Sequence, residues 1–125
     1  MIVKKYGGSS LATLEQVDHI ARSLPGEAHV LVLSARGQQT DQIHKIASRY
    51  ATASREIINS YISLGEISSC ILMHMVLSSL GRKAKVLTCH EAGLEASKLY
   101  EGVITSCETS RISYELDQNN IVIIP

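Results

Sequence analysis

Short apolar runs of strand length alternate with segments of helical spacing along the first half of the chain. Ile2 to Tyr6 is a short extended segment that ends at Gly7-Gly8-Ser9-Ser10, a sequence typical of a tight turn. Thr13-Leu14-Glu15-Gln16 has the spacing of a capping box, and the apolar residues that follow predict a helix ending at Pro25-Gly26. His29 to Leu33 is almost continuously apolar, which indicates a central parallel strand covered on both faces.

The middle of the chain is dominated by helical spacing. One helix is predicted from about Ile43 towards Tyr50, and the pattern returns from Ser54 to about Leu80. Gly65 interrupts the second segment, so we expect two helices there, or one helix with a break just before Glu66. The part from Ile67 to Leu80 is apolar almost all round, which is typical of a helix buried between other elements.

The remaining residues complete an alternation of strands and helices. Further strands are predicted at Ala84 to Thr88, Gly102 to Thr105 and Ile121 to Ile124, and a short helix at Ser110 to Asp117. Such alternation predicts an α/β fold, a layered and mostly parallel sheet with helices on both faces. We expect one domain over residues 1–125.

Composition narrows the classes of partner and compartment. The chain has 12 basic and 12 acidic residues, and its five Tyr are the only aromatic residues, so neither a net positive charge nor a base-stacking surface favours nucleic acid or a membrane surface. Cys70, Cys89 and Cys107 form no C-x-x-C pattern, which argues against a disulfide framework or a zinc site. The apolar stretch from Cys70 to Leu77 is shorter than the roughly 20 residues of a membrane span. With no signal-peptide pattern at the start, we expect a soluble cytoplasmic protein.

The stretch from Lys5 to Ser10 is the first candidate for chemistry. It places a cation at a strand end, then two glycines, then hydroxyls ahead of a helix. Glycines let backbone N–H groups approach anionic oxygens, and a lysine neutralises charge that develops during phosphoryl transfer. The alternative is a plain strand-to-helix turn with a solvated Lys5.

Two further stretches could contribute to the same crevice. Ser34 to Asp41 follows a strand, at the end where open parallel sheets bind ligands, although Thr40 or Asp41 could simply cap the next helix. Glu66 follows Gly65 at a helix start, where a carboxylate can bind a cationic group or only complement the helix dipole. His74 on its apolar segment is interpreted as a core residue, and we assign no metal ligands.

Taken together, these stretches resemble the aspartate kinases of the amino acid kinase superfamily. Val3 to Leu11 is similar to the family opening V-x-K-[FY]-G-G-[TS]-S-[LV]. Val32 to Asp41 resembles V-V-S-A-M-G-x-T-[TD], and Ser63 to Ser68 resembles S-x-G-E-x-[IVL]-S. The resemblance covers the whole chain.

The resemblance implies a role for each matching position. Lys5 would contact the transferring phosphate, the turn of Gly7, Gly8 and Ser9 would bind it, and Ser34 would line the same crevice. Thr40 and Glu66 would bind aspartate, whose β-carboxylate would receive the γ-phosphoryl group of ATP with Mg²⁺ bridging the phosphates.

The departures from the family pattern are also informative. Arg36, Gln39 and Glu91 stand where the family usually has Met, a small or hydroxylated residue, and Gln, which suggests a crevice of altered charge. The family's later G-R-G-G-S-D stretch and its nucleotide-holding segments do not occur in these 125 residues.

Three interpretations follow for function. The first is an aspartate-kinase-type half-domain that is inactive until a second polypeptide or a longer chain supplies the nucleotide site. The second is a non-catalytic binding or interaction module derived from an aspartate kinase. The third, a self-sufficient kinase for another amino acid, has the least support because such sites need all their electrostatic parts together.

Self-association is the last expectation. In the family, further chain covers the strand that corresponds to Ile121 to Ile124, so we expect this apolar strand to be an uncovered edge. The apolar segment from Ile67 to Leu80 would add exposed surface. These features predict a homo-oligomer, or a complex with a chain that supplies the missing half.

Overall fold

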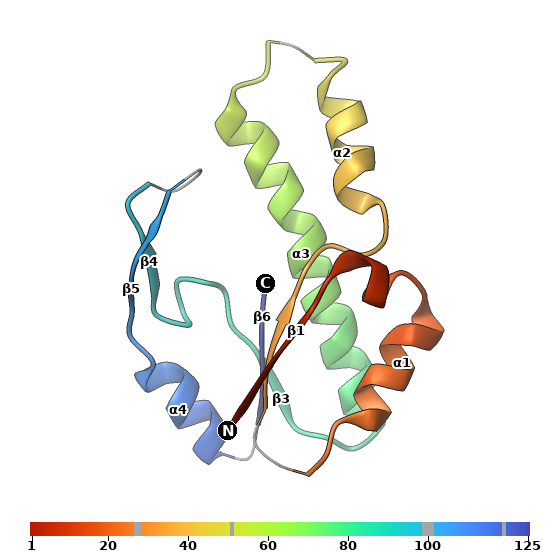
Figure 1. Cartoon of the computed structure of the whole chain (residues 1–125), viewed down its shortest axis with the longest axis vertical. Coiled ribbons are helices and arrows are strands. Elements are labelled where there is room, and N and C mark those ends of the chain that lie inside the picture. The colour runs from red at the N-terminus through yellow and green to blue at the C-terminus, as the bar shows by residue number, and fades with distance from the viewer. Residues whose placement is uncertain (27–28, 51, 99–101, 119) are drawn as a thin grey trace.

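The part of the chain that the structure describes folds into one four-stranded parallel sheet, a two-stranded antiparallel pair and five helical segments. The computed structural model describes residues 1–26, 29–50, 52–98, 102–118 and 120–125 (Figure 1). In chain order the elements are β1 (Ile2–Tyr6), the 3₁₀ helix η1 (Gly8–Leu11), α1 (Leu14–Ser23), β2 (His29–Leu33), α2 (Gln39–Ala47), α3 (Arg55–Ser79), β3 (Ala84–Val86), β4 (Leu94–Ala96), β5 (Ile104–Cys107), α4 (Ser110–Asp117) and β6 (Ile121–Ile124).

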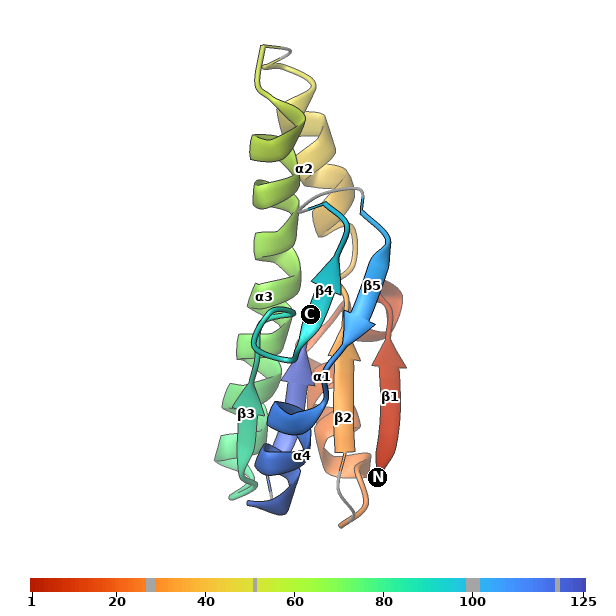
Figure 2. The same ribbon diagram turned by 90° about the vertical axis from the view of Figure 1, so that its left-hand side faces the viewer.

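The sheet has the order β1-β2-β6-β3, and every pairing in it is parallel. Figure 2 shows these strands side by side. The predicted mostly parallel α/β fold is therefore confirmed, and β2 is internal as expected. The prediction for Ile121 to Ile124 is wrong, because β6 lies between β2 and β3 with all of its residues buried.

The antiparallel pair of β4 and β5 differs from the predicted pattern. The expected strand at Gly102 to Thr105 is instead Ile104–Cys107, and its partner Leu94–Ala96 was not predicted. The predicted strand at Ala84 to Thr88 stops at Val86. Both β4 and β5 are mostly exposed, so they lack the buried apolar run by which a strand is recognised in sequence.

The two faces of the sheet have separate apolar cores. On one face, Leu31, Leu33 and Ile123 pack with residues of α1 and α3, including Met73 and Leu77. On the other face, buried side chains of β2 and β6 pack with α4 and the segment after β3; these are Val30, Val122, Ile124, Leu87, Ala92 and Ile112. The alternation of inward residues along β2 produces both cores, and the predicted helices on both faces are confirmed.

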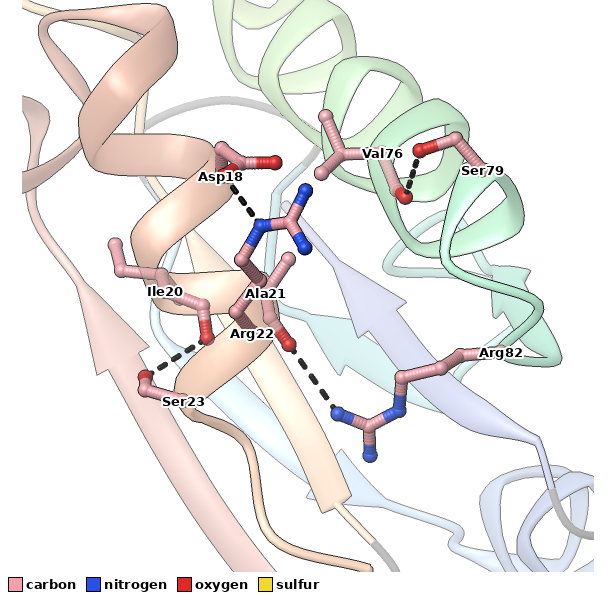
Figure 3. A network of polar contacts seen from close by, with 8 residues as sticks. All are labelled: Asp18, Ile20, Ala21, Arg22, Ser23, Val76, Ser79 and Arg82. Carbon is pink, nitrogen blue, oxygen red and sulfur yellow. Dashed lines mark hydrogen bonds and ion pairs between the residues drawn. The ribbon is translucent and has the colours of Figure 1, made fainter.

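Helix α1 is fixed at both ends. Its predicted capping box is present: the Gln16 N–H donates to Thr13 Oγ1 at 3.2 Å, and the Thr13 N–H donates to Gln16 Oε1 at 3.0 Å. At the other end, the Arg82 guanidinium donates to the carbonyl oxygens of Ala21 (3.2 Å), Leu24 (2.8 Å) and Pro25 (3.0 Å). Figure 3 shows Arg82 reaching across from the end of α3 to Ala21. This arginine joins the two helices through backbone groups that the end of a helix leaves without partners.

Helix α3 runs without interruption for 25 residues, so the predicted break before Glu66 is wrong. Gly65 is tolerated inside the helix at a modest cost in helix propensity, and it is buried where α3 meets the segment after β2. The expectation that the second part is buried all round is also wrong. Cys70, Met73 and Leu77 face the core, whereas Ile71 and Met75 are 49% and 61% exposed.

The length of α3 also bears on the membrane question. Among the described residues, α3 is the one helix whose length and composition would suffice to cross a membrane. It carries Glu66 and His74 and packs one side into the sheet core. His74 is half-buried on this helix, beside Lys85 and Val86 of β3, and is not a fully buried core residue as predicted.

Candidate functional site

The carboxyl ends of the four parallel strands share one edge of the sheet, the edge at which open α/β sheets bind ligands. Lys5 lies near the end of β1, Ser34 directly follows β2, and Pro125 directly follows β6. In Figure 1 this edge lies around the end of β6, between α3 and the pair of β4 and β5. The topology therefore gathers residues from the start, the middle and the end of the sequence.

The two polar turns at this edge are in direct contact. The Gly37 N–H donates to the Gly8 carbonyl oxygen at 2.8 Å, and the Ser34 N–H donates to the Tyr6 carbonyl oxygen at 3.1 Å. A Cβ atom at Gly8 would lie only 2.6 Å from the Ala35 carbonyl oxygen. Gly8 is thus required for the close approach of the turn after β1 to the turn after β2.

Helix α3 approaches the same place through a second glycine. A Cβ atom at Gly65 would lie 3.0 Å from Ala35 Cβ and 3.2 Å from Gln39 Cδ. The missing side chain lets α3 pack closely against the turn after β2, and this contact positions the next residue, Glu66. The glycine read as a helix break is therefore a packing contact that places the carboxylate.

Glu66 and Lys5 are brought together from opposite parts of the sequence. Burial raises the pKa of the Glu66 carboxyl above its ordinary value, and the positive charge of Lys5 partly opposes that rise in pKa. Lys5 itself is exposed, and Glu66 is half-buried. The edge of the sheet thus carries an accessible cation whose charge acts on a carboxylate that is poorly solvated by water.

The other predicted site residues have more varied surroundings. Gly7 is half-buried in an extended conformation and Ser9 is exposed on η1. Ser34 is half-buried beside Tyr6. Thr40 is half-buried in the first turn of α2, next to Gln39, and in the described part of the chain no hydrogen bond joins its side chain to Lys5 or Glu66.

Two cysteines near Glu66 were not predicted to belong to the site. Burial raises the pKa of the Cys70 thiol to about 12, with further contributions from the charges of Glu66 and Cys89. Burial is also the larger cause that raises the pKa of Cys89, and the negative charge of Glu66 raises it further. The Cys89 thiol lies 3.8 Å from the Pro125 carbonyl oxygen. Both groups are therefore neutral thiols at pH 7, unsuited to nucleophilic chemistry. Cys89 could have been found by the rule already used for Ser34, since it closely follows a strand end.

Two of the three departures from the family pattern, Arg36 and Glu91, have local structural roles. The Arg36 guanidinium donates to the carbonyl oxygens of Leu11 (2.9 Å) and Ala12 (3.3 Å), which ties the turn after β2 to η1. Glu91 Oε2 accepts hydrogen bonds from the Thr88 N–H (2.8 Å) and hydroxyl (2.9 Å), and these bonds lower the pKa of Glu91. Each of these side chains is held by neighbouring backbone groups, which accounts for its charge without a ligand.

The family assignment follows from comparison of the whole chain. A sequence model of the Amino acid kinase family matches residues 1–125. The chain belongs to this family. The aspartokinases of Helicobacter pylori (strain ATCC 700392 / 26695) and Geobacillus stearothermophilus are 31% and 32% identical to it over 131 aligned residues. Each alignment covers 99% of this chain and 32% of the relative, so the chain spans about a third of the length of these curated relatives.

Solved structures of amino acid kinase relatives have the same fold. The aspartate kinase from Synechocystis superimposes with a TM-score of 0.83 at 25% identity, covering 98% of this chain and 21% of that chain. Aspartokinase III of E. coli, in complex with lysine and aspartate, superimposes with a TM-score of 0.76 at 12% identity over 99% of this chain and 40% of that chain, which shows the fold alone. The resemblance to aspartate kinases is confirmed.

Proposed function

We propose that residues 1–125 form the amino-acid-binding and phosphate-facing part of an aspartate-kinase-type site, in which ATP donates a phosphoryl group to the β-carboxylate of aspartate. The observation that supports this proposal is the electrostatic interaction of Lys5 with half-buried Glu66 at the carboxyl edge of the sheet. A carboxylate that burial has deprived of water gains most from a cationic partner. The ammonium group of an amino acid is such a partner, and Lys5 supplies a cation for phosphate.

Each site residue has a role in this proposal. Lys5 neutralises charge on the transferring phosphate, and the turn of Gly7, Gly8 and Ser9 offers backbone N–H groups to its oxygens. Ser34 lines the same crevice beside that turn. Glu66 binds the aspartate ammonium group. Thr40, in the first turn of α2, binds a carboxylate group of the aspartate. The chemistry is then one of positioning and charge neutralisation.

The nucleotide would come from outside these residues. The family uses ATP with Mg²⁺, but the described residues hold no group of three His, Cys, Asp or Glu side chains that could bind a metal ion. A Mg²⁺ ion would therefore be held by the substrate phosphates, by water and by residues outside these 125. We accordingly expect turnover only together with a polypeptide that supplies the nucleotide-holding segments.

The test separates amino acid binding from turnover. Titration calorimetry of the purified chain should show that aspartate binds, that succinate, which lacks the ammonium group, binds more weakly, and that Glu66→Gln removes this difference. A coupled assay should detect no aspartate-dependent ATP turnover by the chain alone. A normal kinase rate, or equal binding of aspartate and succinate to the unsubstituted chain, would contradict the proposal.

Matched controls are available on the same elements. Lys4 neighbours Lys5 on β1 but faces the opposite side of the sheet, because it pairs with Leu31 and Lys5 pairs with Val32. Lys4→Ala and Glu56→Gln, the latter in the exposed first turn of α3, should leave aspartate binding unchanged. If aspartate binds but no nucleotide-supplying chain restores turnover, the non-catalytic binding module becomes the better interpretation.

A further inference from the structure

Cys70 and Cys89 carry two thiols at the carboxyl edge of the sheet that the proposed function does not use. Cys70 is fully buried on α3 and belongs to the apolar core that includes Ile123 of β6. Cys89 lies in the segment after β3, and its thiol donates to the carbonyl oxygen of Pro125, which directly follows β6. Figures 1 and 2 show this segment turning next to the C-terminus. Both cysteines are therefore associated with the end of the same internal strand.

The lengths of α3 and β3 bring the two cysteines to the same height along the sheet. Leu80, after the end of α3, and Ala84, the first residue of β3, both pack against the core at the opposite edge. Cys70 lies ten residues back from Leu80 along the helix, a rise of about 15 Å. Cys89 lies five residues beyond Ala84, up to about 16 Å in an extended segment. Because α3 packs against β3, equal height brings the two cysteines close together.

The electrostatics of the thiols agree with this placement. After burial, the charges of Glu66 and Cys89 are the causes that raise the pKa of the Cys70 thiol. Glu66 precedes Cys70 by four residues, about one turn, so both lie on the same side of α3. Cys89 is exposed and lines a cavity of about 450 Å³ together with His90 and Thr105, among others. A small molecule in solution can therefore reach Cys89, whereas the core covers Cys70.

We propose that Cys70 and Cys89 form an intramolecular disulfide when the chain meets a low-molecular-weight disulfide such as oxidised glutathione. The Cys89 sulfur attacks one sulfur of the oxidant, which forms a mixed disulfide, and the first glutathione leaves with the Cys89 proton. The Cys70 sulfur then attacks the Cys89 sulfur, and the second glutathione leaves with the Cys70 proton. Two protein thiols are oxidised, and the oxidant is reduced to two thiols.

Burial has opposite effects on the rate and on the equilibrium of this exchange. The attacking species is the thiolate, so the raised pKa of both thiols makes each step slow at pH 7. A pair of cysteines whose reduced form is stabilised makes a strongly oxidising disulfide. Here burial destabilises the thiolates, while a disulfide has no charge that burial could disfavour. The bond is therefore slow to form and resists reduction once it has formed.

The inference is independent of the proposed function. The pairing of the thiols is measured without aspartate or ATP, and the aspartate titrations are made on the reduced chain. The disulfide would nevertheless join α3 to the segment after β3 one turn from Glu66. Failure of the thiols to pair and failure of aspartate to bind are thus separate outcomes.

Mass spectrometry of the 125-residue chain tests the pairing. After incubation with oxidised glutathione at mildly alkaline pH, a digest should contain two peptides joined through Cys70 and Cys89. Cys107→Ser should leave this bond unchanged. Cys70→Ala should instead retain glutathione on Cys89, because the second thiol that would displace it is missing. Cys89→Ser should leave Cys70 reduced, since Cys70 is buried.

Urea unfolding followed by circular dichroism gives a second measurement and checks that each variant is folded. The bond closes a loop from residue 70 to residue 89, which restricts the unfolded chain. In the Cys107→Ser chain, oxidation should therefore lower the equilibrium constant of unfolding by about 100-fold, and dithiothreitol should reverse the change. The Cys89→Ser, Cys107→Ser chain, treated in the same way, should not change. Equal stability of the oxidised and reduced Cys107→Ser chains would overturn the proposal.

The main competing pair is Cys89 with Cys107. The Leu94 N–H donates to the Cys89 carbonyl oxygen at 2.9 Å, and Leu94 pairs with Cys107 across β4 and β5. A Cys89–Cys107 disulfide as the main product would overturn the proposal. So would glutathione that persists on Cys89 while Cys70 is present, because it would place the two Cα atoms more than about 7 Å apart. A disulfide between two copies of the chain, seen as a doubled mass, would also overturn it.

Discussion

Removal of the Arg82 side chain should be among the most destabilising changes on the surface of this protein. Its guanidinium donates to the carbonyl oxygens of Ala21, Leu24 and Pro25 at the end of α1. Arg82→Met keeps most of the apolar stem but removes every one of these bonds. Ala21 is fully buried, so its carbonyl group has poor access to water as a replacement partner.

The expected loss can be worked from these contacts. A hydrogen bond to a charged group contributes about 1.5–3 kcal/mol, but partly exposed bonds that share one side chain are not additive. We expect Arg82→Met to lower the free energy of unfolding by about 2–3 kcal/mol, which corresponds to a melting temperature about 10 °C lower in a domain of this size. Arg82→Lys should be intermediate, because one ammonium group cannot reproduce the planar fork.

Urea unfolding followed by circular dichroism measures the effect. Arg22→Met is the matched control, because Arg22 lies on α1, the helix whose end Arg82 contacts (Figure 3). Arg22 is bonded to Asp18 at 2.6 Å, but both side chains are exposed, and exposed pairs contribute little. Equal losses for Arg82→Met and Arg22→Met would refute the claim that Arg82 joins α1 to α3. So would a loss below about 1 kcal/mol for Arg82→Met.

Three further predictions concern the site. A small anion such as sulfate should bind at the turn of Gly7, Gly8 and Ser9, and titration calorimetry should show weaker binding in Lys5→Ala but not in Lys4→Ala. Gly8→Ala should cost about 1–3 kcal/mol in urea unfolding, because its Cβ would clash with the Ala35 carbonyl oxygen; an unchanged midpoint would contradict the close approach. Since burial raises the folded-state pKa of Glu66 above 4.5, wild-type stability should fall relative to Glu66→Gln as pH rises from about 4 to 7; a constant difference would contradict the pKa shift.

The sequence predicted best those features that depend on local chemistry. The capping box of α1, the apolar run of β2 and the turn after β1 each depend on residues close together in the chain, and each is present. The order of strands depends on packing between distant segments. The continuous apolar run of Ile121 to Ile124 is the same signal that indicated a covered strand at His29 to Leu33, but it does not say which strands lie on either side, so the position of β6 between β2 and β3 could only come from the fold.

The candidate site shows the same division. Lys5 and Glu66 were identified by their local context, but their proximity depends on Gly65 packing against Ala35 and Gln39. The role of Gly65 was wrongly predicted because the sequence alone does not distinguish a glycine that allows close packing from a glycine that ends a helix. Cys70 was missed because it carries no motif, and only the folded chain places it near Glu66. Cys89 closely follows a strand end and could have been found by that rule, but its effect on the same site also depends on the fold.

The internal position of β6 has a consequence for how the protein folds. β2 and β3 do not pair with each other, and β6, the last strand in chain order, pairs with both. During synthesis, β1 and β2 can pair early, but the sheet cannot become continuous until residues 121–124 are available. Such pairing between distant segments is slow because the loop entropy is lost before the contacts form. Until then the apolar sides of β2 and β3 would be open to other chains, which favours aggregation. We therefore expect a substitution such as Ile123→Asp, which disrupts the last strand, to reduce the yield of soluble protein.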